Sequence, residues 1–126
     1  MMENKKIPYI WGTGVILSDL SLEEVAEIIS ERLFDGLPFG GKEECIYEEV
    51  PAVYIALPIM GFKIILSTGH ANSYNLEVKP YELFRRHIYK NNIPEERISF
   101  DTYLYHLLKY ELEDVPGIQV IEPKYE

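Results

Sequence analysis

The clearest pattern of apolar and polar positions along the chain predicts a helix at residues 19–33. In "LSLEEVAEIISERLFDG", the apolar residues recur at the spacing of one helix face and comprise Leu22, Val25, Ala26, Ile29 and Leu33. Ser21 can cap the first free amides while Glu24 reaches back to it, which is a capping box, and Gly36 provides a stop. We therefore expect Asp19–Leu33 to form the best-defined helix, with one face buried.

Runs rich in β-branched and aromatic residues predict strands along much of the remaining chain. They cover Pro8–Leu17, Ala52–Leu57, Phe62–Ser67, Tyr74–Lys79 and the "IQVI" segment Ile118–Ile121. The second and third runs flank "PIMG", whose Pro58 and Gly61 suit a turn, so an antiparallel hairpin is expected there. Alternation in the fourth run directs Tyr74, Leu76 and Val78 inward.

Two further helices are predicted in the second half of the chain. "PYELFRRHIYKNN" starts with Pro80, a favoured first helical residue, and "SFDTYLYHLLKYELED" places four leucines on one face. Leu37–Glu44, with Pro38 and paired glycines, is expected to be a loop. The order of elements predicts one domain, residues 1–126, with an α+β fold: a mostly antiparallel sheet with two or three helices packed on one face.

The charge of the chain is negative and unevenly placed. The net charge is −9, and Asp19–Glu49 alone carries ten acids against two bases. Nucleic-acid binding requires clustered lysines and arginines that neutralise phosphates, so direct binding of nucleic acid is not expected. A positively charged protein is the partner that this composition favours.

The single cysteine, Cys45, cannot form an internal disulfide, which is typical of a reducing compartment. No run approaches the roughly 18 apolar residues that a membrane span requires. The run Ile7–Leu17 is interrupted by Pro8 and two glycines and lacks a cleavage pattern after it, which argues against a secretion signal. We therefore expect a cytoplasmic protein without a membrane partner.

No motif identifies a reaction. "GTG" at residues 12–14 fails as a dinucleotide fingerprint, because the third glycine would fall on Leu17. His87 and His106 have no second histidine at helical spacing for a metal face, and Cys45 lies beside Glu43 and Glu44, which would raise rather than lower its thiol pKa. The sequence thus predicts no catalytic residue, no cofactor and no metal.

The acidic residues instead suggest a binding surface. Glu23, Glu27 and Glu31 form an i, i+4, i+8 row opposite the apolar stripe, and a second acidic cluster follows the glycine-rich loop. Tyrosine offers a large contact area beside that cluster. The predicted partner-binding face comprises Glu23, Glu27, Glu31, Glu43, Glu44, Tyr47 and Glu48.

In size, acidity and lack of a catalytic motif, the chain resembles the small acidic immunity proteins with which bacteria neutralise toxins, many of them basic nucleases. The resemblance assigns no residues. It implies a non-catalytic immunity or inhibitor module for a basic partner, with the oligomeric state left open. The alternative is a small enzyme or ligand-binding domain that uses the polar loop around His70, Asn72 and Ser73, since a loop histidine can act as a general base.

Overall fold

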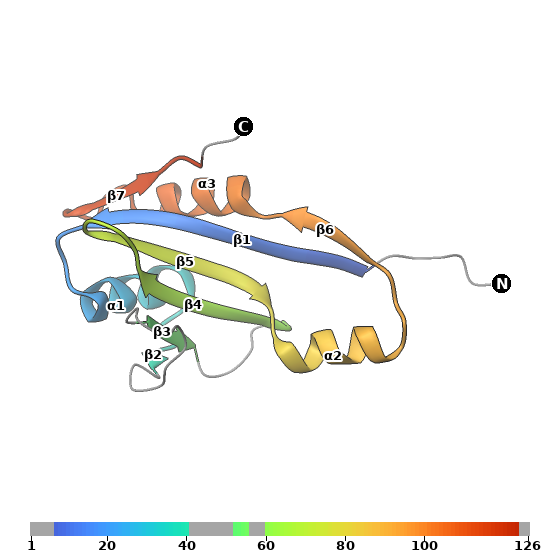
Figure 1. The fold of residues 1–126 in the computed structure, drawn as a ribbon. Coiled ribbons are helices and arrows are strands. Elements are labelled where there is room, and N and C mark those ends of the chain that lie inside the picture. Colours follow the sequence, from blue (N-terminus) through green and yellow to red (C-terminus); the bar gives the residue numbers. More distant parts are fainter. Residues whose placement is uncertain (1–6, 41–51, 56–59, 124–126) are drawn as a thin grey trace.

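A sheet with helices against one face forms the protein in the computed structural model, which describes residues 7–40, 52–55 and 60–123. The elements of this part of the chain are β1 (Ile7–Ser18), α1 (Leu22–Leu33), β2 (Phe39–Gly40), β3 (Ala52–Ile55), β4 (Phe62–Thr68), β5 (Ser73–Pro80), α2 (Glu82–Lys90), β6 (Glu95–Ser99), α3 (Asp101–Leu112) and β7 (Ile118–Ile121). Figure 1 shows α1 at one end of the sheet and α2 beyond the other end.

The sheet is organised around β1. Strands follow one another in the order β2-β3-β4-β5-β1, and each of these neighbouring pairs is antiparallel. The other edge of β1 pairs with two strands: β6 runs parallel beside Ile7–Trp11, and β7 runs antiparallel beside Val15–Ser18. The predicted α+β fold with a mostly antiparallel sheet is confirmed, as is the antiparallel pairing of β3 with β4. Leu57 and Pro58, which belong to the strand end and turn predicted between them, lie outside the described residues.

The core lies between one face of the sheet and the helices α1 and α3. Alternate residues of β5 point into it, so the predicted inward direction of Tyr74, Leu76 and Val78 is confirmed. The apolar stripes of the two helices meet them; the buried helix residues of the core are Leu22, Val25, Ala26, Ile29, Leu104, Leu108 and Leu112. This burial removes apolar surface from water and is the main stabilising contribution.

Two glycines allow α3 to lie directly against β1. A Cβ atom added to Gly14 would collide with Cδ1 of Leu108, and one added to Gly12 would lie 2.7 Å from Cβ of Phe100. The backbone of Phe100 also donates from its N–H to the carbonyl of Trp11, at 2.7 Å. The "GTG" segment, which has no cofactor spacing, therefore serves the close packing of a helix on a strand.

Helix α1 has the predicted capping box. The hydroxyl of Ser21 accepts a hydrogen bond from the Glu24 backbone N–H at 3.1 Å, and the Glu24 carboxylate accepts one from the Ser21 N–H at 3.1 Å. Because Ser21 is the N-cap, the helix begins at Leu22 and not at Asp19. Gly36, at a φ of +85°, ends the turn that follows the helix, since its N–H donates to the carbonyl of Ser30.

The predicted start of the second helix at Pro80 is wrong. Pro80 is the last residue of β5, where it lies opposite Phe62, and α2 begins at Glu82. The N–H of Tyr81 donates to the carbonyl of Gly61 at 3.0 Å, which carries the hairpin pairing one residue beyond the proline. A proline at the end of a strand removes no ladder hydrogen bond that the strand needs.

Two strands lie where the sequence did not predict them. β6 forms from "EERIS", most of whose residues are exposed, because it pairs in parallel with the first residues of β1. Within the predicted loop Leu37–Glu44, Phe39 and Gly40 form β2 opposite Ile55 and Tyr54. Both assignments depend on partners distant in the sequence, and neither segment has a strand pattern of its own.

Candidate functional site

The outer face of α1 carries the first predicted acidic row. Glu23, Glu27 and Glu31 are exposed, because the apolar stripe of the same helix turns the opposite face toward the core. The three carboxylates therefore lie along one side of the helix, one turn apart, as the sequence predicts.

A groove of about 330 Å³ runs beside this row. Its lining comprises Glu23, Ala26, Glu27, Ser30, Glu31, Gly36, Pro38, Phe39 and Val53, and we call it the acidic groove. Three carboxylates lie on the α1 side, while Ala26, Phe39 and Val53 contribute apolar surface from the helix, β2 and β3. The acidic groove thus combines negative charge with an apolar lining, which suits a side chain that has an aliphatic stem and a cationic end.

The side of the acidic groove that contains Pro38 and Phe39 is held in place by contacts with the end of α1. The Ser30 hydroxyl donates to the carbonyl of Leu37, and the ring of Phe34 meets the ring of Phe39 edge-on at a centroid distance of 6.2 Å. Phe39 is in turn paired with Ile55 in the sheet. These contacts fix the position of the apolar wall relative to the glutamates.

The negative charge of this face is not neutralised by the cation on its own helix. Arg32 turns toward α3, where its guanidinium lies 3.0 Å from the Asp114 carboxylate and donates to the carbonyl of Glu111. Within the described residues, Glu27 and Glu31 form no ion pair. A basic ligand would therefore not have to displace a cation of the described chain from them.

A buried tyrosine on β5 lies close to the acids at the start of α1. The hydroxyl of Tyr74 donates to the carbonyl of Leu20 at 2.5 Å, just before α1. Burial, and then the negative charges of Glu23 and Glu24, raise the pKa of the Tyr74 phenol above its ordinary value. The Tyr74 phenol is therefore held in its neutral, hydrogen-bonded form.

The second half of the predicted face lies outside the described residues. Glu43, Glu44, Tyr47 and Glu48 all fall between β2 and β3 in the sequence, as does Cys45. Their joining Glu23, Glu27 and Glu31 on one surface stays a prediction. The apolar lining of the acidic groove, on the other hand, was not predicted, because Phe39 and Val53 come from two strands whose pairing the sequence alone does not reveal.

The loop of the alternative hypothesis is a tight connection between β4 and β5. The Ser73 hydroxyl donates to the carbonyl of His70 at 2.6 Å, and the Asn72 side-chain amide donates to the Asp19 carboxylate at 3.1 Å. Ala71 and Asn72 both have positive φ, of 49° and 58°. The polar groups of Asn72 and Ser73 thus hold the turn, and the exposed His70 extends beside it.

A groove of about 500 Å³ lies next to this turn, lined by Asn72 and Asp19 together with residues of β1 and the start of β7. His70 is not among its lining residues. A histidine that acts as a general base must reach the reacting group within hydrogen-bond distance. The geometry of this turn therefore gives the enzyme hypothesis no specific support.

The described residues contain no group of three or more histidine, cysteine, aspartate or glutamate side chains arranged to hold a metal ion. None of the helices in this part of the chain has the length and apolar character that crossing a bilayer requires.

No family model matches the chain, and neither the curated proteins nor the solved structures contain one similar enough to match it.

Proposed function

We propose that the protein is a non-catalytic binding module whose acidic groove receives a lysine or arginine side chain of a positively charged protein partner. The observation that carries this proposal is the meeting of three exposed carboxylates and an apolar wall in one groove. The stem of a long cationic side chain would lie on Phe39 and Val53, and its charged end would face Glu27 and Glu31.

The overall charge supports the same function. A net charge of −9 raises the rate of encounter with a basic protein, and it opposes association with other acidic surfaces. An immunity or inhibitor protein for a basic toxin is the particular role that we propose, on the ground of size and acidity. The proposed compartment is the cytoplasm, since the chain has a single cysteine.

The test begins by cross-linking the protein to its partner in cells of its source and identifying the partner peptides attached near α1. Association rates are then measured with the purified partner at several salt concentrations. Glu27→Lys together with Glu31→Lys should slow association by about tenfold or more and reduce its dependence on salt, because both acids face the incoming cation. Their effect on stability should be small, since exposed charges contribute little to folding.

Two controls separate this local role from general charge and from the alternative hypothesis. Glu82→Lys together with Glu96→Lys changes the net charge equally at exposed positions on α2 and β6, away from the acidic groove, and should slow association much less. His70→Ala should leave the interaction unchanged. Equal slowing by both charge-reversed variants would contradict the role of the acidic groove, and a loss of function of two orders of magnitude in His70→Ala would favour an enzyme.

A further inference from the structure

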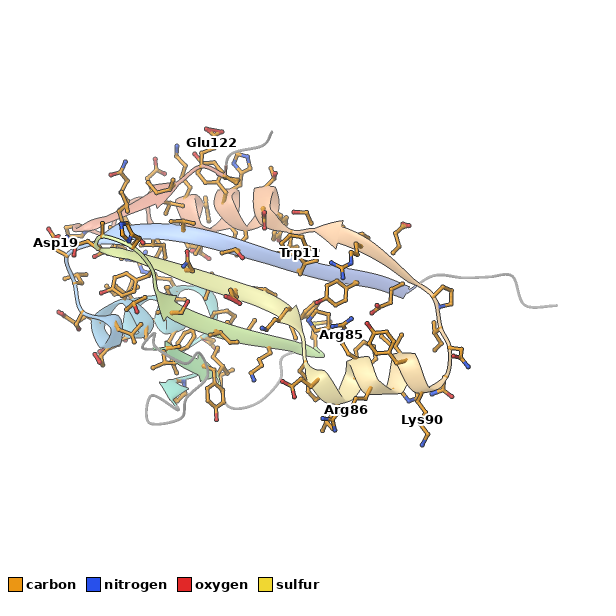
Figure 2. The ribbon with its side chains drawn as sticks, in the orientation of Figure 1. Trp11, Asp19, Arg85, Arg86, Lys90 and Glu122 are labelled. Carbon is orange, nitrogen blue, oxygen red and sulfur yellow. The ribbon has the colours of Figure 1, made fainter. Side chains whose placement is uncertain are left out.

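A cluster of aromatic and cationic side chains lies on the sheet face that α1 and α3 leave open. Its members are Tyr9 and Trp11 on β1, Lys79 on β5, Arg85 on α2 and Arg97 on β6, and we call it the aromatic-basic cluster. Gly12 and Gly14 face α3, so the alternating residues Tyr9, Trp11 and Thr13 point the other way. Figure 2 shows Trp11 and Arg85 toward the same end of the sheet, far from Asp19.

Two guanidinium groups converge on one ring of this cluster. The Cζ atom of Arg85 lies 4.4 Å from the centroid of the Tyr9 ring, and that of Arg97 lies 5.2 Å from it. Tyr9 and Arg97 are paired in the β1–β6 ladder, which places them side by side. Arg85 approaches the Glu95 carboxylate at 3.5 Å, whereas Arg97 is exposed and has no ion pair with a described residue.

A cavity of about 260 Å³ opens between these groups, close to the lower end of the roughly 300–1,000 Å³ typical of small-molecule sites. Its lining comprises Tyr9, Trp11, Gly12, Thr13, Glu77, Val78, Lys79 and Arg97. The Trp11 side chain is partly open to solvent, with 36% of the residue exposed. The Lys79 ammonium lies 3.9 Å from the Glu77 carboxylate, so this cavity contains both signs of charge beside an indole.

The strand that carries the rings is held on both sides. The Thr13 N–H donates to the Asp101 carboxylate at 2.8 Å, in the interval of β1 between its pairings with β6 and β7. The neighbouring Gly12 is paired with Val78 of β5. A binding surface fixed in this way loses little freedom when a ligand arrives, which favours affinity.

We propose that the aromatic-basic cluster binds a nucleoside monophosphate, with the base against Trp11 and the phosphate at Arg97. Stacking of a base on an aromatic side chain is favourable for every base, and a guanidinium matches the geometry of a phosphate. Lys79 adds positive charge, and the Glu77 carboxylate can accept a hydrogen bond from an amino group of the base. A single phosphate escapes most of the repulsion that a net charge of −9 imposes on a polynucleotide.

This site lies on a different part of the molecule from the acidic groove and does not depend on the function proposed for that groove. Trp11 is the only tryptophan in the chain, so its fluorescence reports directly on the site. The experiment titrates the whole protein with adenosine monophosphate, adenosine or ribose 5-phosphate, up to about 10 mM. The indole is excited at a wavelength longer than those that tyrosine absorbs, so that only Trp11 contributes to the emission. Free N-acetyltryptophanamide corrects for light absorbed by the nucleotide.

Adenosine monophosphate should quench Trp11 in a saturable manner, adenosine should bind about tenfold more weakly, and ribose 5-phosphate should leave the fluorescence unchanged. Arg97→Gln should weaken the binding of adenosine monophosphate about tenfold, because one charge-assisted contact is lost. The matched control is Arg86→Gln: Arg86 is exposed on α2, and in Figure 2 it points away from Trp11. It should bind as the wild type does.

No saturable quenching by adenosine monophosphate would overturn the proposal, as would equal quenching by ribose 5-phosphate. Equal weakening by Arg86→Gln and Arg97→Gln would also overturn it, since a general charge effect would then account for the binding. Thermal unfolding checks that Arg97→Gln is folded. If that variant does not fold, Lys79→Gln decides, with weaker binding supporting the proposal and unchanged binding contradicting it.

Discussion

Helices α1 and α2 lie at opposite ends of the sheet and are held by different interactions (Figure 1). α1 has a capping box and buries a continuous stripe in the main core, whereas α2 has no side-chain cap and only one fully buried residue, Ile88. α2 is joined to the sheet through Arg85, which contacts the Tyr9 ring and the Glu95 carboxylate. Both helices were predicted from their own sequences, but α1 is held to the molecule by a buried apolar stripe and α2 by a few contacts with the sheet.

The two helices also differ in the sign of their exposed charges. The exposed face of α1 carries glutamates, while Arg85, Arg86 and Lys90 give α2 three cations. The two proposed binding sites also have opposite preferences, for a cationic side chain beside the glutamates of α1 and for a phosphate at Arg97 of β6. A protein with a large negative net charge can still present a local positive site.

The largest expected effect compares two buried isoleucines, Ile29 of α1 and Ile88 of α2, which are 0% and 2% exposed. Ile29→Ala should lower the free energy of unfolding by about 3–5 kcal/mol, because it opens a cavity in the main core. Ile88 lies outside that core cluster, so Ile88→Ala should cost less, about 2 kcal/mol. Denaturant unfolding measures both.

Hydrogen exchange sharpens the same comparison. In Ile88→Ala, loss of protection should be concentrated in the amides of α2, whereas Ile29→Ala should reduce protection across the sheet. Equal costs with equally widespread loss of protection would contradict the view that α2 is held locally.

A smaller effect is expected from the cap of α1. Ser21→Ala removes the hydroxyl that accepts from the Glu24 N–H, and should lower the free energy of unfolding by about 1 kcal/mol. Ser99→Ala serves as the control, because its hydroxyl only accepts a longer bond, of 3.3 Å, at the start of α3. A cost for Ser21→Ala no larger than that of the control would show that the stripe alone, without the cap, specifies α1.

The smallest effect concerns pH and the tyrosine beside α1. Because the pKa of Tyr74 is raised in the folded state, the folded protein holds the phenol proton more tightly than the unfolded chain does. Stability from this source is fully present below the pKa of an unfolded tyrosine, about 10, and falls as the pH rises through the pKa of the folded state. Unfolding measured in denaturant at neutral and alkaline pH should show this decline.

Tyr74→Phe should make that decline shallower, at the cost of the hydrogen bond to Leu20. Tyr110→Phe, at a residue that is 78% exposed, should retain the wild-type decline. An identical dependence on pH in all three proteins would mean that Tyr74 is not the group responsible.

The sequence predicted those parts of the fold whose signals are local. The capping residue, the apolar stripe and the terminal glycine of α1 all lie within sixteen residues, Ser21–Gly36, and agree with one another. By contrast, the residues of β6 are mostly polar, and they form a strand only because residues 7–11 lie beside them. Pro80 fits both a helix start and a strand end, and only the pairing with Phe62 distinguishes the two.

The candidate site likewise has a part that local sequence signals predict and a part that depends on strand pairing. The outward direction of Glu23, Glu27 and Glu31 follows from the stripe of their own helix, so it was predictable. The apolar wall of Phe39 and Val53 depends on the antiparallel pairing of β2 with β3, which a local pattern does not encode. The aromatic-basic cluster was missed for the same reason, since its five residues come from four elements.

The pairing of β1 has a consequence for how the chain folds as it is synthesised. This strand leaves the ribosome well before its partners, which lie in residues 73–78, 95–99 and 118–121. Pairings between such distant segments close slowly, because the entropy of long loops must be lost first. The apolar residues of β1 therefore remain without their sheet neighbours until those segments have been synthesised, and we expect this strand to be the segment of the nascent chain that most needs protection from aggregation.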